Sequence, residues 1–149
     1  MNNRIEKVVL LRASPFKVWQ ALTNYQEFGE WFGVILEKPF VPGEISFGQI
    51  TYPGYEHVKL EMTVQKMEVP ILFSFMWHPF AIETDKDYSA EIPTLVEFRL
   101  EKIEEGTLLS VTESGFEKIP EERRIEAFRM NDSGWTEQME NIKNYIEMS

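Results

Sequence analysis

The residue in this 149-residue sequence with the clearest chemical potential is Glu113. It follows Leu109 and Val111 at intervals of two, and side chains at that interval share one face of a β-strand. A carboxylate on an apolar face could bind a cationic or hydroxylated ligand, or act as a general base. It could equally lie in water at the rim of the sheet or accept hydrogen bonds from backbone amides. The spacing predicts the face and leaves the role open.

Asp132 is the second acidic candidate, because it interrupts the apolar stripe of a long helical segment near the C-terminus. An acid at a core-facing position is costly unless it is paired or hydrated. It would either place a polar group in a pocket or mark a local irregularity, since poor helix formers surround it at Asn131, Ser133 and Gly134. Both interpretations stay open.

Two histidines, His57 and His78, are the only side chains of the type that ordinarily exchanges protons near neutral pH. Neither has a second histidine or a carboxylate at a metal-binding or catalytic spacing, so we interpret both as ordinary surface residues. The sequence has no cysteine, which excludes disulfides, thiolate catalysis and cysteine-based metal sites. We therefore expect no catalytic residue, no metal site and no cofactor.

The charge balance is acidic. Fifteen Lys and Arg residues oppose 25 Asp and Glu residues, for a formal net charge of −10. Such a field repels nucleic acid, and the basic pair Arg123-Arg124 has acidic neighbours on both sides. The apolar runs are far shorter than the ~20 residues of a membrane-spanning helix, and the N-terminal segment lacks a signal-peptide pattern. We expect a cytoplasmic protein that binds neither nucleic acid nor a membrane.

The hydrophobic pattern changes twice along the chain. Residues 5–11 indicate a strand, and Ser14-Pro15 and Asn24 begin two short helices through their capping chemistry. Period-two alternation then predicts about six antiparallel strands before residue 116. A polar loop over residues 78–93 interrupts them; such loops are often lids or binding elements, although many are only tolerated insertions. One domain over residues 1–149 accounts for this order.

After Pro120 the pattern becomes strongly helical. Positions of one stripe recur at intervals of three and four: Ile125, Phe128, Asp132, Trp135, Met139, Ile142 and Ile146. We predict that this helix packs on the concave face of a curved sheet and that a cavity remains between them. Trp135 should be buried over the middle of that face, and Gly134 before it should let the sheet approach closely.

Inward-facing aromatic and methionine side chains would line any such cavity, although most of them would simply be core. A few polar side chains among them would orient a ligand. The candidate ligand-binding residues are Phe47, Tyr55, Met62, Phe75, Trp77, Phe98, Glu113, Phe128, Asp132, Trp135 and Met139.

Four stretches carry a resemblance to a known family: Arg12–Leu22, the pair Trp31-Phe32, Gly106–Phe116, and Gly134-Trp135 followed by Asn141–Ile146. In this order they resemble homologues of the C-terminal domain of the activator of the 90-kDa heat-shock protein ATPase. That family is part of the START-like (SRPBCC) helix-grip superfamily. The resemblance implies an α+β helix-grip fold: a strand, two short helices, about six antiparallel strands and a long C-terminal helix on the concave face.

Three functions are compatible with these observations. The first is non-catalytic binding of a small apolar molecule, aromatic or lipid-like, between the sheet and the C-terminal helix. The second is a cyclase-like or hydratase-like enzyme, which the superfamily allows and which would need Glu113 or Asp132 as its general base. The third is a co-chaperone-like interaction module that docks a protein partner with a basic surface. We favour the first.

Overall fold

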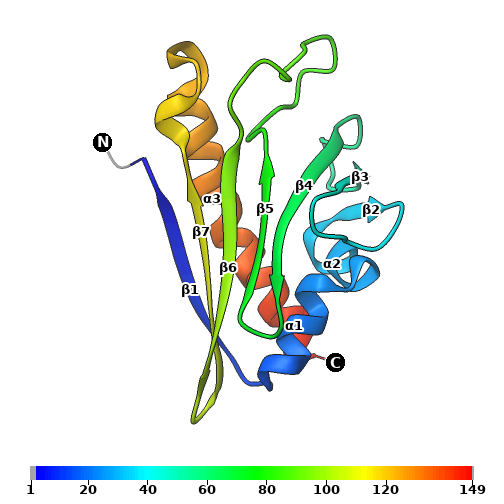
Figure 1. Ribbon diagram of the computed structural model, residues 1–149, viewed down its shortest axis with the longest axis vertical. Coiled ribbons are helices and arrows are strands. Elements are labelled where there is room, and N and C mark those ends of the chain that lie inside the picture. The colour runs from blue at the N-terminus through cyan, green and yellow to red at the C-terminus, as the bar shows by residue number, and fades with distance from the viewer. Residues whose placement is uncertain (1–2, 149) are drawn as a thin grey trace.

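The computed structural model describes residues 3–148. Its elements follow the predicted order, with one strand, two short helices, six strands and a long helix (Figure 1). They are β1 (Ile5–Leu11), α1 (Pro15–Thr23), α2 (Tyr25–Phe32), β2 (Val34–Leu36), β3 (Ile45–Ile50), β4 (Lys59–Glu68), β5 (Leu72–Trp77), β6 (Thr94–Ile103), β7 (Gly106–Ser114), a 3-10 turn η1 (Phe116–Lys118) and α3 (Glu121–Glu147).

Side-chain caps begin both short helices. The backbone N–H of Lys17 donates to the hydroxyl of Ser14 at 3.2 Å, and Pro15 occupies the first helical position. The Asn24 side chain accepts from the backbone N–H groups of Gln26 and Glu27, each at 3.0 Å. These contacts confirm the helix starts that the sequence predicts.

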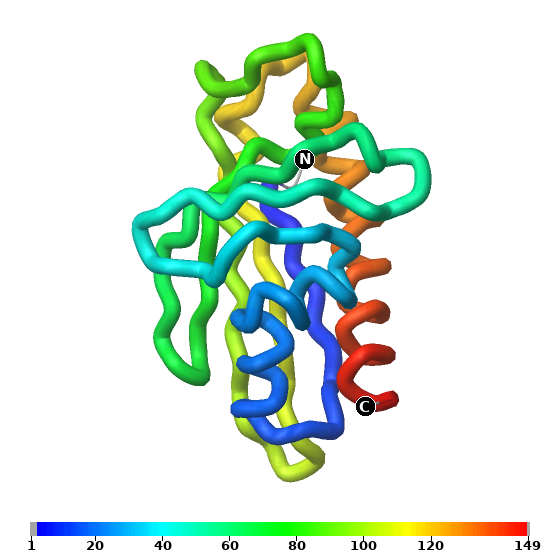
Figure 2. Tube along the Cα trace, turned by 90° about the vertical axis from the view of Figure 1, so that its right-hand side faces the viewer, coloured from blue at the N-terminus to red at the C-terminus, as the bar shows by residue number. Residues whose placement is uncertain are grey.

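The seven strands form one antiparallel sheet in the order β1-β7-β6-β5-β4-β3-β2. β1 therefore pairs with the last strand of the chain, and both edge strands come from its N-terminal third. Figure 1 shows α3 crossing one face of this sheet, and in Figure 2 the helix runs down one side of the molecule with α1 and α2 beside the strands. The predicted α+β helix-grip arrangement is confirmed.

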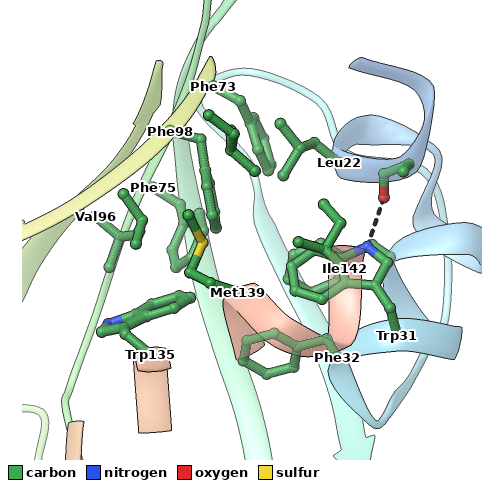
Figure 3. Packing of buried hydrophobic residues seen from close by; sticks show 14 of the residues in the cluster. Leu22, Trp31, Phe32, Phe73, Phe75, Val96, Phe98, Trp135, Met139 and Ile142 are labelled. Atoms are coloured by element: carbon green, nitrogen blue, oxygen red, sulfur yellow. Dashed lines mark hydrogen bonds between the residues drawn. The ribbon is translucent and has the colours of Figure 1, made fainter. Parts of the chain in front are cut away.

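The space between α3 and the middle of the sheet is filled by side chains. Trp135, Met139 and Ile142 of α3 are buried against Phe75 and Phe98 of the sheet (Figure 3). The predicted burial of Trp135 is confirmed, at 2% exposed, and its ring centroid lies 5.6 Å from that of Phe98. Dense packing of this kind fills the interface between this part of the helix and the sheet.

The apolar stripe of α3 differs at its start from the predicted one. Ile125 is 53% exposed, whereas Ala127 is fully buried. The first turns of the helix lie beyond the end of the sheet (Figure 1), so a side chain there has no strand to pack against. No helix of residues 3–148 is long and apolar enough to cross a membrane.

Candidate functional site

Glu113 on β7 is completely buried. Its Oε1 accepts hydrogen bonds from Trp135 Nε1 at 2.8 Å and from Asn131 Nδ2 at 2.9 Å. Its Oε2 accepts from Trp77 Nε1 at 2.8 Å, from the Thr94 hydroxyl, and from Asn131 Nδ2 at 3.2 Å. A carboxylate offers roughly four lone-pair positions, and these contacts occupy them. Glu113 therefore has no free position from which to take a proton from a substrate.

The donors around Glu113 come from three other parts of the fold. Trp77 ends β5, Thr94 begins β6, and Asn131 and Trp135 lie one turn apart on α3. All of these donors are neutral, and no ion pair to Glu113 forms within the described residues. The carboxylate thus stabilises the contact of three strands with the helix through charge-assisted hydrogen bonds.

The two indole rings bound to Glu113 also stack on each other. The ring centroids of Trp77 and Trp135 lie 5.7 Å apart with an interplanar angle of 26°. Trp135 is buried, whereas Trp77 keeps part of its surface exposed to a neighbouring cleft. Glu113 therefore sets the position of an aromatic ring that a ligand in the cleft would touch.

The cleft has a volume of about 830 Å³. Three segments surround it: the loop of residues 78–93, the end of β3 with the start of β4, and the part of α3 that contains residues 130–138. In Figure 2 the green loop arches at one end of the molecule toward the orange first half of α3. Aromatic side chains contribute much of the lining: Phe32, Tyr52, Tyr55, Trp77, Phe80 and Tyr88.

The loop of residues 78–93 is held to α3 by Arg123. The guanidinium forms an ion pair with Glu91, with the closest N–O distance at 2.6 Å, and donates to the Pro79 carbonyl at 2.8 Å. It also lies over the Tyr88 ring, 4.9 Å from the centroid. Burial alone would raise the pKa of Glu91, but the hydrogen bonds and positive charge of Arg123 outweigh it and lower that pKa.

His78 opens this loop and lines the cleft. Its Nδ1 is buried and is the only buried side-chain nitrogen or oxygen without a hydrogen-bond partner in residues 3–148. Burial lowers the pKa of His78, although the nearby carboxylates of Glu91, Glu61 and Asp87 act in the opposite direction. The ring is therefore neutral at neutral pH.

Gly134 lines the cleft and leaves space in it, because it has no side chain. A Cβ atom placed there would meet no heavy atom within 4 Å, although this glycine lies inside α3 and lines the cleft. The expectation that Gly134 lets the sheet approach closely is therefore wrong, because the residue faces open space. Asn131, Gln138 and Glu137 lie beside it on the same face of the helix.

Two of the predicted ligand-binding residues, Tyr55 and Trp77, line the cleft. Glu113 and Trp135 do not line it; Glu113 accepts hydrogen bonds from Trp77 and Trp135, and the two indole rings stack on each other. The remaining inward-facing candidates are packed in the core away from the cleft: Met62, Phe75, Phe98 and Met139.

Phe47 is 43% exposed, so the predicted inward orientation of this residue is wrong. Its neighbour Ser46 is the buried residue, at 2% exposed, and pairs with the fully buried Met62. The next inward position is Gly48, where a Cβ atom would lie 2.8 Å from Val34 Cγ2. Ser46 and Gly48 thus lie on the inner face of β3, close to β2, and alternation along the strand places Phe47 on the outer face.

Asp132 and Phe128 lie outside the cleft lining as well. The carboxylate of Asp132 forms an ion pair with Lys7 of β1 at 3.0 Å and keeps about half of its side chain, 47%, exposed. Phe128 packs against Phe116, with ring centroids 5.1 Å apart. Of the two interpretations left open for Asp132, a polar group in a pocket does not apply, because the helix turns this residue toward the edge strand.

Sequence reasoning interpreted both histidines as ordinary surface residues; His57 is indeed exposed, but His78 is partly buried. Both His57 and His78 line the cleft. The available signal was the position of His78, directly after the aromatic strand Phe73–Trp77 and at the start of the long loop. No group of three or more metal-ligating side chains lies together in the part of the chain that the structure describes.

Comparisons with known proteins agree with this fold. The model of the family described as activator of Hsp90 ATPase homolog 1-like protein matches residues 12–147. A protein from Mesorhizobium loti is similar in structure, with a TM-score of 0.77, 19% identity and 98% of each chain covered.

Two further solved structures are similar over nearly their whole length. The Aha1 dimer from Colwellia psychrerythraea has a TM-score of 0.71 and 21% identity, with 97% of this chain and 96% of that chain covered. A protein from Bacillus halodurans has a TM-score of 0.69 and 25% identity, with 96% of each chain covered. A search of curated proteins found no match. Because the family model matches nearly the entire sequence, the chain belongs to the activator of Hsp90 ATPase homolog 1-like family.

Proposed function

We propose that this protein binds a small, largely apolar molecule in the cleft between residues 78–93 and α3, without catalysing a reaction on it. The observation that carries the proposal is the cleft itself, since about 830 Å³ lies within the range of small-molecule sites. Its lining joins aromatic side chains to a few polar ones, which is the usual makeup of such sites. The site lies beside the middle of α3 and not between the helix and the sheet, because side chains of the core fill that space.

The enzyme hypothesis names Glu113 or Asp132 as the general base, and that residue would have to reach a substrate. Glu113 is buried under Trp77 with its oxygens already hydrogen-bonded, and Asp132 is paired with Lys7 outside the lining. Neither can act as the general base for a molecule in the cleft, because a base must lie within hydrogen-bond reach of the proton that it removes. These contacts remove the two general bases that the enzyme hypothesis names, whereas the cleft itself supports binding.

Gly134 provides a sharp test of the proposal. Gly134→Leu would direct a large side chain into the cleft, and it should not destabilise α3, because Leu is a better helix former than Gly by up to about 1 kcal/mol. We expect this variant to keep the thermal stability of the wild type and to lose at least about tenfold in affinity for an apolar fluorescent dye, an effect of about 1.4 kcal/mol.

Glu126→Leu is the matched control, because Glu126 is exposed on the same helix and does not line the cleft. The control variant should bind the dye as the wild type does. A wild-type protein that binds no dye, or equal dye affinity in all three proteins, would contradict binding at this site.

A second candidate is docking to a basic protein surface. The observations in its favour are the net charge of −10 and membership of a family named for an activator of the Hsp90 ATPase. Charge-steered association weakens as ionic strength rises. If the amount of a basic partner that the protein captures did not change between about 0.05 and 0.5 M salt, this mechanism would be excluded.

A further inference from the structure

The two ring nitrogens of His78 have different surroundings. Nδ1 is buried without a partner, whereas Nε2 is neither buried nor hydrogen-bonded in the described residues, and the ring lines the cleft. The ring is neutral at neutral pH, so one nitrogen carries a hydrogen and the other accepts. Which nitrogen carries the hydrogen decides what His78 offers to a ligand.

Burial places that hydrogen on Nε2. An orphaned buried N–H group is rarer in proteins than an acceptor that lacks a partner. With the proton on Nε2, the buried Nδ1 is a bare acceptor and the N–H group is the one that water or a ligand in the cleft can reach. The charged groups whose fields act on the ring are Glu91, Arg123, Glu61 and Asp87.

The rest of the lining disfavours anions. Four carboxylates and two ammonium groups belong to residues that line the cleft: Glu61, Glu83, Asp87, Glu137, Lys59 and Lys86. Lys86 is also engaged, because its Nζ lies 3.8 Å from a Glu91 oxygen and over the Tyr88 ring. A ligand with a negative charge, such as a fatty acid, would therefore meet net repulsion.

We infer that the cleft selects an uncharged, flat molecule with an acceptor oxygen, such as an aromatic ketone, and that the Nε2–H group of His78 donates to that oxygen. This inference rests on the proposed function and names the class of molecule that the same cleft binds. The partly exposed Trp77 ring, held in place by its bond to Glu113, supplies the flat apolar surface. His78 follows Trp77 directly in sequence and supplies a neutral donor beside it.

Three naphthalene probes of similar size separate these contributions: 2-acetylnaphthalene, 2-ethylnaphthalene and 2-naphthoate. Titration followed by amide NMR shifts at about pH 7.5 should give the tightest binding for the ketone. Its advantage over the ethyl compound should be about 3- to 10-fold, the value of one net hydrogen bond. The naphthoate should bind weaker than the ketone by about fivefold or more, and this difference should shrink at high salt.

His78→Phe is the test of the donor, because Phe keeps a ring of similar size and has no N–H group. The variant should lose the preference for the ketone and keep its affinity for the ethyl compound. A preference that survives in His78→Phe, or that disappears instead in Tyr55→Phe, would overturn the inference while leaving cleft binding intact. If none of the probes binds the wild type, the proposed function fails and the inference fails with it.

Discussion

At the scale of single residues, Glu113 joins the core to the cleft. The same carboxylate binds the indole N–H groups of Trp77 and Trp135, so the two rings stack in one fixed arrangement. Trp77 is the ring that faces the cleft and Trp135 is the ring that faces the core. A buried polar network of this kind specifies geometry as long as every member keeps its partner.

Glu113→Gln should destabilise the protein through this network. The glutamine amide keeps one acceptor oxygen and places an NH₂ donor against the donors that Glu113 now satisfies. Each buried donor left without an acceptor costs about 1–3 kcal/mol. Urea unfolding should therefore show a clearly lower free energy of unfolding than for the wild type.

Thr94→Val is the matched control for that experiment, because it removes one neutral donor and leaves the carboxylate with its other bonds. Its cost should be about 1 kcal/mol, the net value of one hydrogen bond. Equal stability of Glu113→Gln and the wild type would show that the carboxylate does not hold the two indoles in place.

At the scale of elements, Arg123 makes the loop of residues 78–93 a wall of the cleft. The guanidinium is 12% exposed and the Glu91 side chain 10%, so this ion pair is largely removed from water. Largely buried ion pairs contribute more to stability than exposed ones only when their hydrogen-bond geometry is good. Here three guanidinium–carboxylate contacts lie between 2.6 and 3.1 Å. The loop therefore has a defined anchor at its C-terminal end.

Arg123→Met should loosen this loop without unfolding the sheet. The methionine keeps an apolar stem but loses the bonds to Glu91 and Pro79. Amide hydrogen exchange of residues 80–91 should be at least about tenfold faster than in the wild type, which corresponds to about 1.4 kcal/mol of local stability. Arg129→Met on an exposed part of the same helix should leave these rates unchanged. Unchanged exchange in both variants would contradict the anchor.

The pKa of Glu91 adds a pH dependence to this anchor. The folded pKa is lower than the ordinary value of 4.5, so the ion pair stabilises the loop at any pH above that value. The contribution falls as the pH drops below about 4.5 and is lost once the pH passes the folded pKa. The local stability of residues 80–91, measured by amide hydrogen exchange, should therefore fall at low pH in the wild type. The difference in this stability between the wild type and Arg123→Met should then become smaller.

At the scale of the whole molecule, the fold follows from local chemistry that the sequence displays. Ser14 and Asn24 cap helices through bonds to residues two or three positions away, and the strands alternate with a period of two. These signals need no knowledge of distant contacts. The element order, the strand pairing of β6 with β7 and the burial of Trp135 were therefore predictable.

The cleft depends on contacts between residues far apart in the sequence, which no local pattern reports. The Nδ1 atom of His78 is buried because residues 78–93 fold back onto α3, and Arg123 holds them there from a position more than thirty residues away. Phe47 faces outward because the pairing of β3 with β2 and β4 places Ser46 and Gly48 on the inner face. Alternation along one strand predicts two faces, and only the neighbouring element decides which face is the core.

The lowered pKa of His78 gives the last prediction. Its ordinary value is 6.5, and burial disfavours the charged ring, so below about pH 6.5 the unfolded chain binds a proton that the folded protein does not. Stability should therefore fall as the pH is lowered from about 6.5 toward the folded pKa, and His78 should contribute no such slope above that window.

The carboxylates with lowered pKa values, Glu56, Asp87 and Glu91, have ordinary values of 4.5 or below, so their contributions change mainly at lower pH. Thermal unfolding between about pH 5.5 and 7.5 therefore isolates the histidine. The wild-type Tm should fall across this range, and the Tm of His78→Phe should fall less, because a phenyl ring binds no proton. Parallel curves for the two proteins would mean that the His78 ring can accept its proton without leaving the folded structure, and the neutral donor inferred for the cleft would lose its physical basis.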